Sequence, residues 1–304
     1  MMRRRSMARL VGAPFAHRLA RRWATSGGRG SNLAWRAAAR VAGPVPETAV
    51  VTLGDARLEL DTHHPAEFQF YRGQYEVDEM AVMRALVPRG GVALDIGANI
   101  GFYTLMLAQL VGEDGRVFAF EPSPLAIHRL TAAAAGLASV RVLTVAVSDV
   151  SGTSRLLVAP GDSMHSTLRS SALDRTEWSA AAEVETAPLD VLSEALGWGE
   201  VDFVKVDVEG HEAAVLAGAS RLLAAGQVRA MLLEVAPQYG ATDWVGELAS
   251  LPDYQCFALV RTGHLSWRHT PRLFGLPRPG NEGYSLVALR TDAAADMRVK
   301  GWIR

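Results

Sequence analysis

Cysteine, lysine and long apolar runs are scarce in this 304-residue chain, and each absence excludes a class of protein. The single cysteine, Cys256, cannot form an intramolecular disulfide, and no cysteine–histidine cluster has zinc-ligand spacing, which favours a reducing, cytoplasmic setting. No apolar run reaches the roughly 18 to 20 residues of a transmembrane helix, so we expect a soluble or peripheral protein. With 49% hydrophobic and 21% charged residues, the chain is neither disordered nor fibrous.

Acidic residues are missing from residues 1–46, which contain ten arginines. The rest of the chain carries 21 basic and 32 acidic residues, a balance of −11, so the two parts differ physically. The basic arm is interpreted as a flexible tail, a short amphipathic helix or a transit peptide, and peripheral membrane contact through it stays open. The seven tryptophans are dispersed and form no stacking platform, so we expect no nucleic-acid partner.

From about residue 90, short apolar runs alternate with helical patterns, which predicts an α/β fold with a doubly wound, mainly parallel sheet. A leading segment, 47–90, precedes this domain at 91–292, and a tail, 293–304, follows it. The expected strands are Val92–Ile96, Val117–Phe120, Val140–Val145, Val201–Val206, Arg229–Val235, Gln255–Val260 and Tyr284–Leu289. The expected helices are Phe102–Val111, Ser123–Gly136, Leu189–Leu196 and His211–Ala225. A hairpin is expected at Thr153–Val158, and a loop or lid at 160–178.

Ligands bind such sheets at the carboxyl ends of the strands, where two features coincide. Gly97 and Gly101 follow the first strand and let the backbone approach a ligand closely. Glu121 ends the second strand, where its carboxylate can accept hydrogen bonds from both hydroxyls of a ribose. Together they predict an adenosine-type cofactor. The alternative is that the glycines only form a turn and that Glu121 favours the helix that follows.

The spacing of this loop separates two cofactor classes. Nicotinamide-binding folds use G-x-G-x-x-G facing a pyrophosphate, whereas this loop is D-x-G-x-N-x-G, with Ala98 and Asn99 inside it. The Asp95 carboxylate and the Asn99 amide suit a cofactor that presents an ammonium and a carboxylate, which describes S-adenosylmethionine. A non-catalytic or nicotinamide-binding Rossmann protein is the alternative.

Five segments carry a resemblance to the FkbM family of S-adenosylmethionine-dependent methyltransferases, in the Rossmann-like class I group, over roughly residues 55–290. They are Gly73-Gln74-Tyr75-Glu76, Leu94 to Thr104 (LDIGANIGFYT), Phe120-Glu121-Pro122, Ala146-Val147-Ser148-Asp149, and Lys205 to Glu212 (KVDVEGHE). The resemblance implies a seven-stranded sheet with a reversed final strand. It also implies O-methylation of a hydroxyl on a sugar, glycan or natural product. The implied cofactor-binding residues are Asp95, Gly97, Ala98, Asn99, Gly101, Glu121 and Ala146.

The last segment contains the candidate catalytic residues. Asp207 ends a strand, and Glu209 and His211 precede a helix, so all three meet the sheet edge where a methyl acceptor must lose a proton. We rank Asp207 and Glu209 before His211. Alternatively, Lys205 forms a buried pair with a carboxylate and Glu212 caps the helix. No metal ligands are assigned, although several carboxylates here can bind a divalent cation that acidifies the hydroxyl.

Five further residues are weaker candidates. Tyr75 and Glu76 either close over the cofactor or begin a helix whose Met80, Met83 and Leu86 are core residues. His63 and His64 are interpreted as surface residues, and His165 as a solvated residue of the lid.

Overall fold

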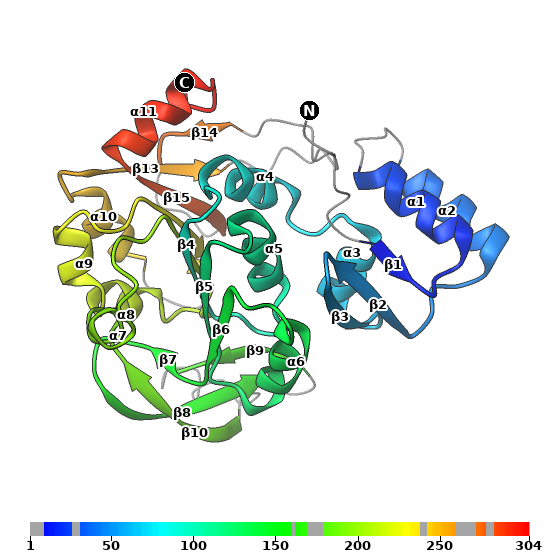
Figure 1. The fold of residues 1–304 in the computed structure, drawn as a ribbon, viewed down its shortest axis with the longest axis horizontal. Helices are drawn as coiled ribbons and strands as arrows, with labels where there is room; N and C mark the ends of the chain where they lie inside the picture. The colour runs from blue at the N-terminus through cyan, green and yellow to red at the C-terminus, as the bar shows by residue number, and fades with distance from the viewer. Residues whose placement is uncertain are drawn as a thin grey trace.

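The computed structural model describes residues 9–25, 31–159, 162–168, 179–237, 242–259, 272–277 and 283–303. Its central sheet contains β4 (Val92–Ile96), β5 (Arg116–Phe120), β6 (Val140–Leu143), β11 (Phe203–Val206), β12 (Ala230–Val235), β13 (Tyr254–Leu259), β14 (Leu273–Phe274) and β15 (Tyr284–Arg290). The order across the sheet is β14-β13-β15-β12-β11-β4-β5-β6. The strands from β6 to β12 are parallel, and β15 is antiparallel to both β12 and β13 (Figure 1).

This arrangement confirms the predicted doubly wound α/β fold. Each of the seven expected strands is present, and the reversed strand is β15. Among the described residues the two-residue β14 adds an eighth strand, at the edge beside β13. Because the strands from β4 to β6 and from β11 to β12 run the same way, their carboxyl ends meet at one edge of the sheet.

Alternation along each buried strand divides its side chains between two hydrophobic cores. One core packs against α4 (Val77–Leu86), α5 (Phe102–Val111) and α11 (Thr291–Val299). The other packs against α7 (Leu189–Leu196), α8 (Glu212–Ala217), α9 (Ser220–Ala224) and α10 (Trp244–Ala249). As expected, Met80, Met83 and Leu86 are core residues, and α6 (Pro124–Ala134) begins directly after Ser123.

The helix expected at His211–Ala225 is interrupted, and that prediction was wrong. The structure has α8 and α9 in its place, separated at Gly218 and Ala219. A Cβ at Gly218 would lie 2.0 Å from the carbonyl oxygen of Ser148. The backbone after the third strand therefore passes against the helix at a contact that the local sequence pattern does not reveal.

A second sheet adjoins the carboxyl end of β6. It contains β7 (Ala146–Val147), β8 (Gly152–Ala159), β9 (Asp162–Thr167) and β10 (Ser179–Ala187), in the order β7-β10-β8-β9. The strand expected at Thr153–Val158 is present as β8, but it pairs with β9 and β10 and does not return against the third strand. The loop expected at 160–178 is wrong for 162–167, which pair with β8. Residues 160, 161 and 169–178 lie outside the described part of the chain. The strand expected at Val140–Val145 ends at Leu143 because the chain then turns into this second sheet.

The basic N-terminal segment is folded where the structure describes it. β1 (Arg9–Val11) pairs with β2 (Thr48–Leu53), which pairs with β3 (Ala56–Asp61). Two helices, α1 (Phe15–Thr25) and α2 (Ser31–Ala42), lie at the right-hand edge of Figure 1, beyond this sheet. The buried Arg21 guanidinium donates to the carbonyl oxygens of Phe70 and Tyr71 and so joins α1 to α3 (Pro65–Arg72). Within the described residues no helix combines the length and the apolar character needed to cross a bilayer.

Candidate active site

The loop between β4 and α5 holds three residues in the left-handed region: Gly97 (φ +77°), Asn99 (φ +50°) and Gly101 (φ +98°). A Cβ at Gly97 would lie 1.9 Å from the carbonyl oxygen of Asp207, and one at Gly101 would lie 2.9 Å from Leu130 Cδ1. Both positions therefore require glycine. The glycine at 97 lets the ends of β4 and β11 come into contact.

Glu121 connects the end of β5 to this glycine loop. Its Oε2 accepts a hydrogen bond of 2.7 Å from the Asn99 N–H, and its Oε1 accepts one of 2.7 Å from the Ser123 N–H. Burial raises the pKa of Glu121 to about 7, although both hydrogen bonds favour the ionised form. The two elements expected to bind one adenosyl group are therefore in direct contact.

A cavity lies at this edge of the sheet, between the strand ends and the second sheet. The glycine loop and the ends of β5 and β11 line one part of it, and segments near α3, β7 and β9 line the rest. The lining residues are His64, Ala66, Tyr75, Ile96 to Ile100, Phe102, Tyr103, Phe120 to Pro122, Val145 to Val147, Leu156, Ser166 to Leu168, Lys205, Asp207 to Glu209 and His211.

Five of the seven predicted cofactor-binding residues line this cavity: Gly97, Ala98, Asn99, Glu121 and Ala146. Gly101 and Asp95 lie behind the lining. Asp95 is fully buried, its Oδ2 accepts a 2.6 Å hydrogen bond from Thr104 Oγ1, and it lies opposite Lys205 in the strand register. Burial raises the pKa of Asp95, and the nearby Lys205 ammonium opposes that rise. Asp95 therefore supports the glycine loop from the protein interior and does not itself line the cavity.

Asp207, the first catalytic candidate, is held between a cation and a second acid. Its Oδ2 accepts a 2.9 Å hydrogen bond from the buried Lys205 ammonium, so the predicted pair exists. The Asp207 carboxylate, together with burial, raises the pKa of Glu234 to about 10. This rise favours the protonated form of Glu234, which can donate a hydrogen bond to Asp207. Asp207 thus lies between the Lys205 ammonium and an acid with a raised pKa.

Lys205 balances the negative charge of this cluster. Burial lowers the pKa of Lys205, but the carboxylates of Asp207, Asp95 and Glu76 raise it more, so the net shift is upward. Its ammonium also lies 4.5 Å from the centre of the Tyr103 ring, a cation–π contact. Lys205 therefore brings a positive charge to a cavity whose lining includes the carboxylates of Glu121, Asp207 and Glu209.

Glu209 and its neighbours form the turn before α8. Glu209 has a φ of +51° and Gly210 a φ of +91°, while Glu212 Oε1 accepts a 3.1 Å hydrogen bond from the Gly210 N–H. Carboxylate oxygens of Asp207, Glu209 and Glu234 lie within 4.8 Å of one another, close enough to hold a divalent cation. The Lys205 ammonium and the Glu234 proton already offset the charge of this set.

His211, the third candidate, ends a short hydrogen-bonded chain. The Ser148 hydroxyl donates to Asp149 Oδ1 at 3.0 Å and lies 3.0 Å from His211 Nε2. When the hydroxyl proton is donated to Asp149, His211 Nε2 is the donor to Ser148 Oγ. In the neutral imidazole the basic nitrogen is then Nδ1.

The sequence analysis missed Glu234 and undervalued Glu76. Glu234 occupies the end of the strand next to β11, so the rule that ligands meet strand ends could have found it. Glu76 begins α4 at a φ of +39° and accepts a hydrogen bond from the Tyr103 hydroxyl, while Tyr75 lines the cavity. Burial, with Glu79 and Asp207, raises the pKa of Glu76 to about 7. The predicted helix start is present, and Tyr75 also lines the cavity.

The remaining histidine predictions have different outcomes. His63 is exposed, as expected, but His64 lines the cavity, so its interpretation as a surface residue was wrong. It is the N-cap residue of α3 and is partly buried. The side chain of His165 lies outside the described part of the structure.

Comparison with known proteins gives a family and many distant structural likenesses, of which three are described here. The methyltransferase FkbM domain matches residues 95–255. No curated protein matches the sequence. An O-methyltransferase from Bacillus cereus in complex with SAH is 14% identical and has a TM-score of 0.40, covering 71% of this chain and 80% of its own. A SAM-dependent methyltransferase from Aquifex aeolicus is 14% identical with a TM-score of 0.41, covering 75% and 94%. An rRNA methylase from Streptococcus thermophilus is 10% identical with a TM-score of 0.41, covering 70% and 94%.

The domain match includes the glycine loop, Glu121 and the segment from Lys205 to Glu212, and it spans slightly more than half of the chain. The structure brings these same segments together around one cavity. The chain therefore belongs to the FkbM family of S-adenosylmethionine-dependent methyltransferases.

Proposed function

We propose that this chain is an O-methyltransferase whose acceptor is a hydroxyl group of a small molecule or a glycan. One observation carries the proposal: Asp207, Glu209 and His211 line the same cavity as the glycine loop and Glu121. Groups that can bind and deprotonate a hydroxyl therefore lie beside the expected methyl donor.

The chemistry of the cavity fits S-adenosylmethionine, which supplies a methyl group on a cationic sulfur. Glu121, Asp207 and Glu209 contribute carboxylates to the lining, against the single ammonium of Lys205. This excess of acid suits a ligand that carries a sulfonium and an ammonium. Val145, Ala146 and Val147, with Leu156, would cover the adenine, and Glu121 would accept the ribose hydroxyls.

We assign to His211 the role of the base that accepts the proton of the acceptor hydroxyl. An imidazole is a competent base near neutral pH, whereas ordinary carboxylates are much weaker bases. In the tautomer that donates from Nε2 to Ser148, Nδ1 is the basic nitrogen of the ring. Asp207, which Lys205 and Glu234 keep ionised, would accept the hydrogen bond of the hydroxyl and orient it.

The charge distribution favours a small or neutral acceptor over a nucleic acid. The cavity is lined by carboxylates, and the chain after residue 46 has a balance of −11, whereas nucleic-acid sites neutralise phosphates with lysine and arginine.

The direct test incubates the full chain with S-adenosylmethionine and a panel of hydroxylated glycans and natural products, and measures S-adenosylhomocysteine release and product mass. We expect acceptor-dependent release and a methyl ether that resists mild base. Methylation of nitrogen or carbon would overturn the O-methyl assignment. Methylation of an RNA but of no panel member would overturn the acceptor class. Titration calorimetry without heat from either cofactor form would contradict cofactor binding itself.

A further inference from the structure

The outward side of α1 carries a stripe of bulky apolar side chains. Phe15, Leu19 and Trp23 recur at every fourth position, so they lie along one side of the helix, and they are 67%, 50% and 52% exposed. Arg18 and Arg22 are exposed beside this stripe, and the Arg18 guanidinium lies 5.9 Å from the centre of the Phe15 ring. α1 therefore presents an apolar and cationic surface to solvent.

The outward side of α2 repeats this pattern at the same spacing. Leu33, Ala37 and Val41 again recur at every fourth position, and Leu33 and Val41 are 68% and 82% exposed. Arg36 and Arg40 stand at the same offsets as the two arginines of α1, and both are exposed. α1 and α2 therefore expose the same combination of apolar side chains and arginines.

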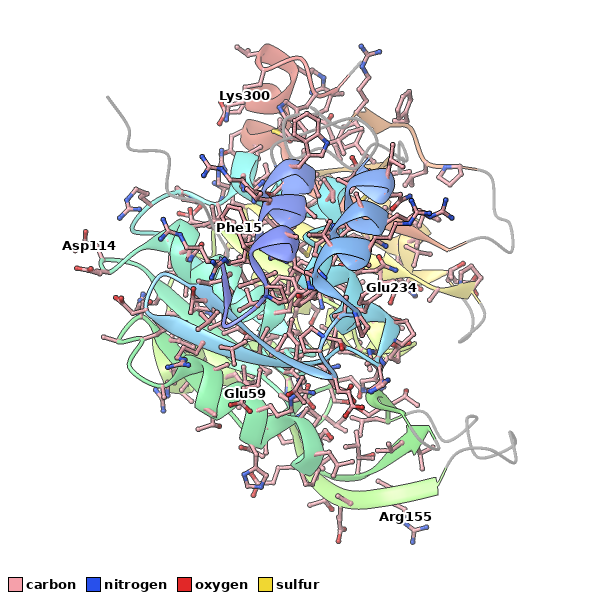
Figure 2. All side chains as sticks on the ribbon, turned by 90° about the vertical axis from the view of Figure 1, so that its right-hand side faces the viewer. Phe15, Glu59, Asp114, Arg155, Glu234 and Lys300 are labelled. Carbon is pink, nitrogen blue, oxygen red and sulfur yellow. The ribbon has the colours of Figure 1, made fainter. Side chains whose placement is uncertain are left out.

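The two outward sides face the same direction. Figure 2 shows α1 and α2 side by side in front of the rest of the chain, with Phe15 labelled on α1. The opposite sides of the helices contain the buried residues Ala20, Ala24, Trp35 and Ala38, which turn toward the protein. We call the outward set the hairpin surface. It consists of Phe15, Arg18, Leu19, Arg22, Trp23, Leu33, Arg36, Arg40 and Val41.

The charge of the hairpin surface is uncompensated. Residues 1–46 contain no acidic residue. Within the part of the chain that the structure describes, the ion pairs involve other arginines, and none of these four side chains has a carboxylate partner. A partner that complements this surface must therefore bring negative charge and also accept bulky apolar groups.

We propose that the hairpin surface docks onto an anionic lipid bilayer. Helices that lie in a bilayer interface combine large apolar side chains with arginine or lysine, as both helices do here. Arginine can bury its aliphatic stem beside an apolar stripe while its guanidinium reaches lipid phosphates. An acidic protein would satisfy the four charges but would also need pockets for five bulky apolar groups spread over two helices.

The helix that would dock is joined to a segment that lines the cavity. Arg21 ties α1 to the C-terminal end of α3, and His64 and Ala66, at the start of α3, line the cavity. α3 is eight residues long, which corresponds to roughly 12 Å. Membrane attachment is therefore linked to the cavity through one short helix.

The test is flotation of the full chain with vesicles of phosphatidylcholine alone or mixed with phosphatidylglycerol, at low and high salt. We expect binding to the anionic vesicles, weaker binding to the neutral ones, and loss of binding at high salt. Phe15→Ser with Leu33→Ser should weaken binding roughly tenfold or more. Replacing Arg18, Arg22, Arg36 and Arg40 by Gln should weaken it at least as much.

Two matched controls keep the test specific. Leu125→Ser with Val150→Ser removes two exposed apolar side chains elsewhere, and Arg89→Gln with Arg141→Gln removes two exposed charges elsewhere. Both controls should bind vesicles as the wild type does. All variants should keep wild-type affinity for S-adenosylmethionine, which shows that they are folded and separates this proposal from the proposed function.

Three results would overturn the proposal. The wild type could bind neither kind of vesicle, or the controls could lose binding as much as the hairpin variants. Finally, the wild type could form a dimer in solution that Phe15→Ser with Leu33→Ser dissociates while vesicles are not bound. That last result would identify the surface as a contact between copies of this chain.

Discussion

Two charged regions of the molecule differ in how their charges are compensated. One is the acidic edge of the sheet, formed by Asp207, Glu209 and Glu234 with Lys205, and the other is the hairpin surface. At the edge, Asp207 is paired with the Lys205 ammonium and with a protonated Glu234, inside a cavity. On the hairpin surface, four arginines are exposed in a segment without a single acid. Burial makes an unpaired charge costly, so the edge compensates its charges internally, whereas exposed charges remain available to an external partner.

The two regions also differ in how they are assembled. The acidic edge collects side chains from β4, β5, β11 and β12, which are far apart in the sequence. The hairpin surface arises from spacing within two single helices. Substitutions at the edge should therefore affect cofactor binding and turnover but not vesicle binding, and substitutions on the hairpin surface should do the reverse.

His211→Gln should give the largest difference between an effect on turnover and an effect on vesicle binding. The amide can still donate to Ser148 but is no longer a base, so turnover should fall roughly 10²- to 10⁴-fold. Cofactor affinity by calorimetry and vesicle binding should remain unchanged. Wild-type turnover in this variant would remove His211 from proton transfer.

Gly97→Ala tests whether the edge depends on close backbone contact. The new Cβ would meet the Asp207 carbonyl oxygen, so we expect a loss of more than about 2 kcal/mol in the free energy of unfolding, measured with denaturant. Gly90→Ala is the matched control, because Gly90 has nearly the same φ, +75°, with nothing within 4 Å of its Cβ. It should lose only about 1 kcal/mol. Equal losses would show that backbone conformation, and not the contact, requires glycine at 97.

Glu121→Ala should weaken binding of S-adenosylmethionine roughly tenfold or more, because two charge-assisted hydrogen bonds to the ribose are lost. The wild type should also bind the cofactor less tightly as the pH falls. Since the pKa of Glu121 is raised to about 7, the carboxylate is ionised above that pH and becomes protonated below it. Affinity should therefore be constant above pH 7 and fall by at most roughly tenfold per pH unit below it.

The Glu121→Gln variant is the control for this pH dependence. It should bind weakly and equally across the same range. A pH profile identical to that of the wild type would assign the dependence to another group.

Substitutions of Glu234, the partner of Asp207, should have a smaller effect on turnover, and two variants distinguish the role of its proton. Because Glu234 is protonated, Glu234→Gln keeps a donor for Asp207 and should retain most of the turnover. Glu234→Ala removes that donor and should reduce turnover roughly tenfold, since one hydrogen bond to a charged group is lost. Similar losses in both variants would contradict the protonated state of Glu234.

The smallest effect is expected from removing metal ions. The Lys205 ammonium and the Glu234 proton already offset the charge of Asp207, Glu209 and Glu234. Dialysis against EDTA should therefore leave turnover within about twofold, an energy below that of a typical hydrogen bond. Loss of activity that magnesium or manganese restores would show that this set holds a catalytic cation.

Local patterns were sufficient for most of the fold. The apolar runs predicted all seven main strands, and the buried α5 was recognised from its continuous apolar character. The errors occur where another segment intervenes. At the break between α8 and α9, Gly218 passes close to Ser148 and its carbonyl oxygen accepts from the Asp190 N–H, while the strand at 162–167 pairs with the edge of β8.

The candidate site shows the same division. The glycine loop, Glu121 and the segment from Lys205 to Glu212 could be predicted because their positions at strand ends are encoded by nearby residues. Glu234 lies near a strand end, but its closeness to Asp207 follows from the pairing of β11 with β12, which only the tertiary structure shows. The inward position of His64 depends on where α3 packs.

The sequence by itself determined the parallel sheet, the cofactor loop and the alternating pattern of arginines and apolar residues in the two N-terminal helices, because each follows from short-range periodicity and backbone requirements. Only the tertiary structure decided which acids share a cavity, which of them carries a proton, and which helix faces are exposed. Those properties depend on distances between segments far apart in the chain, and the electrostatic energy and burial of a side chain are functions of such distances.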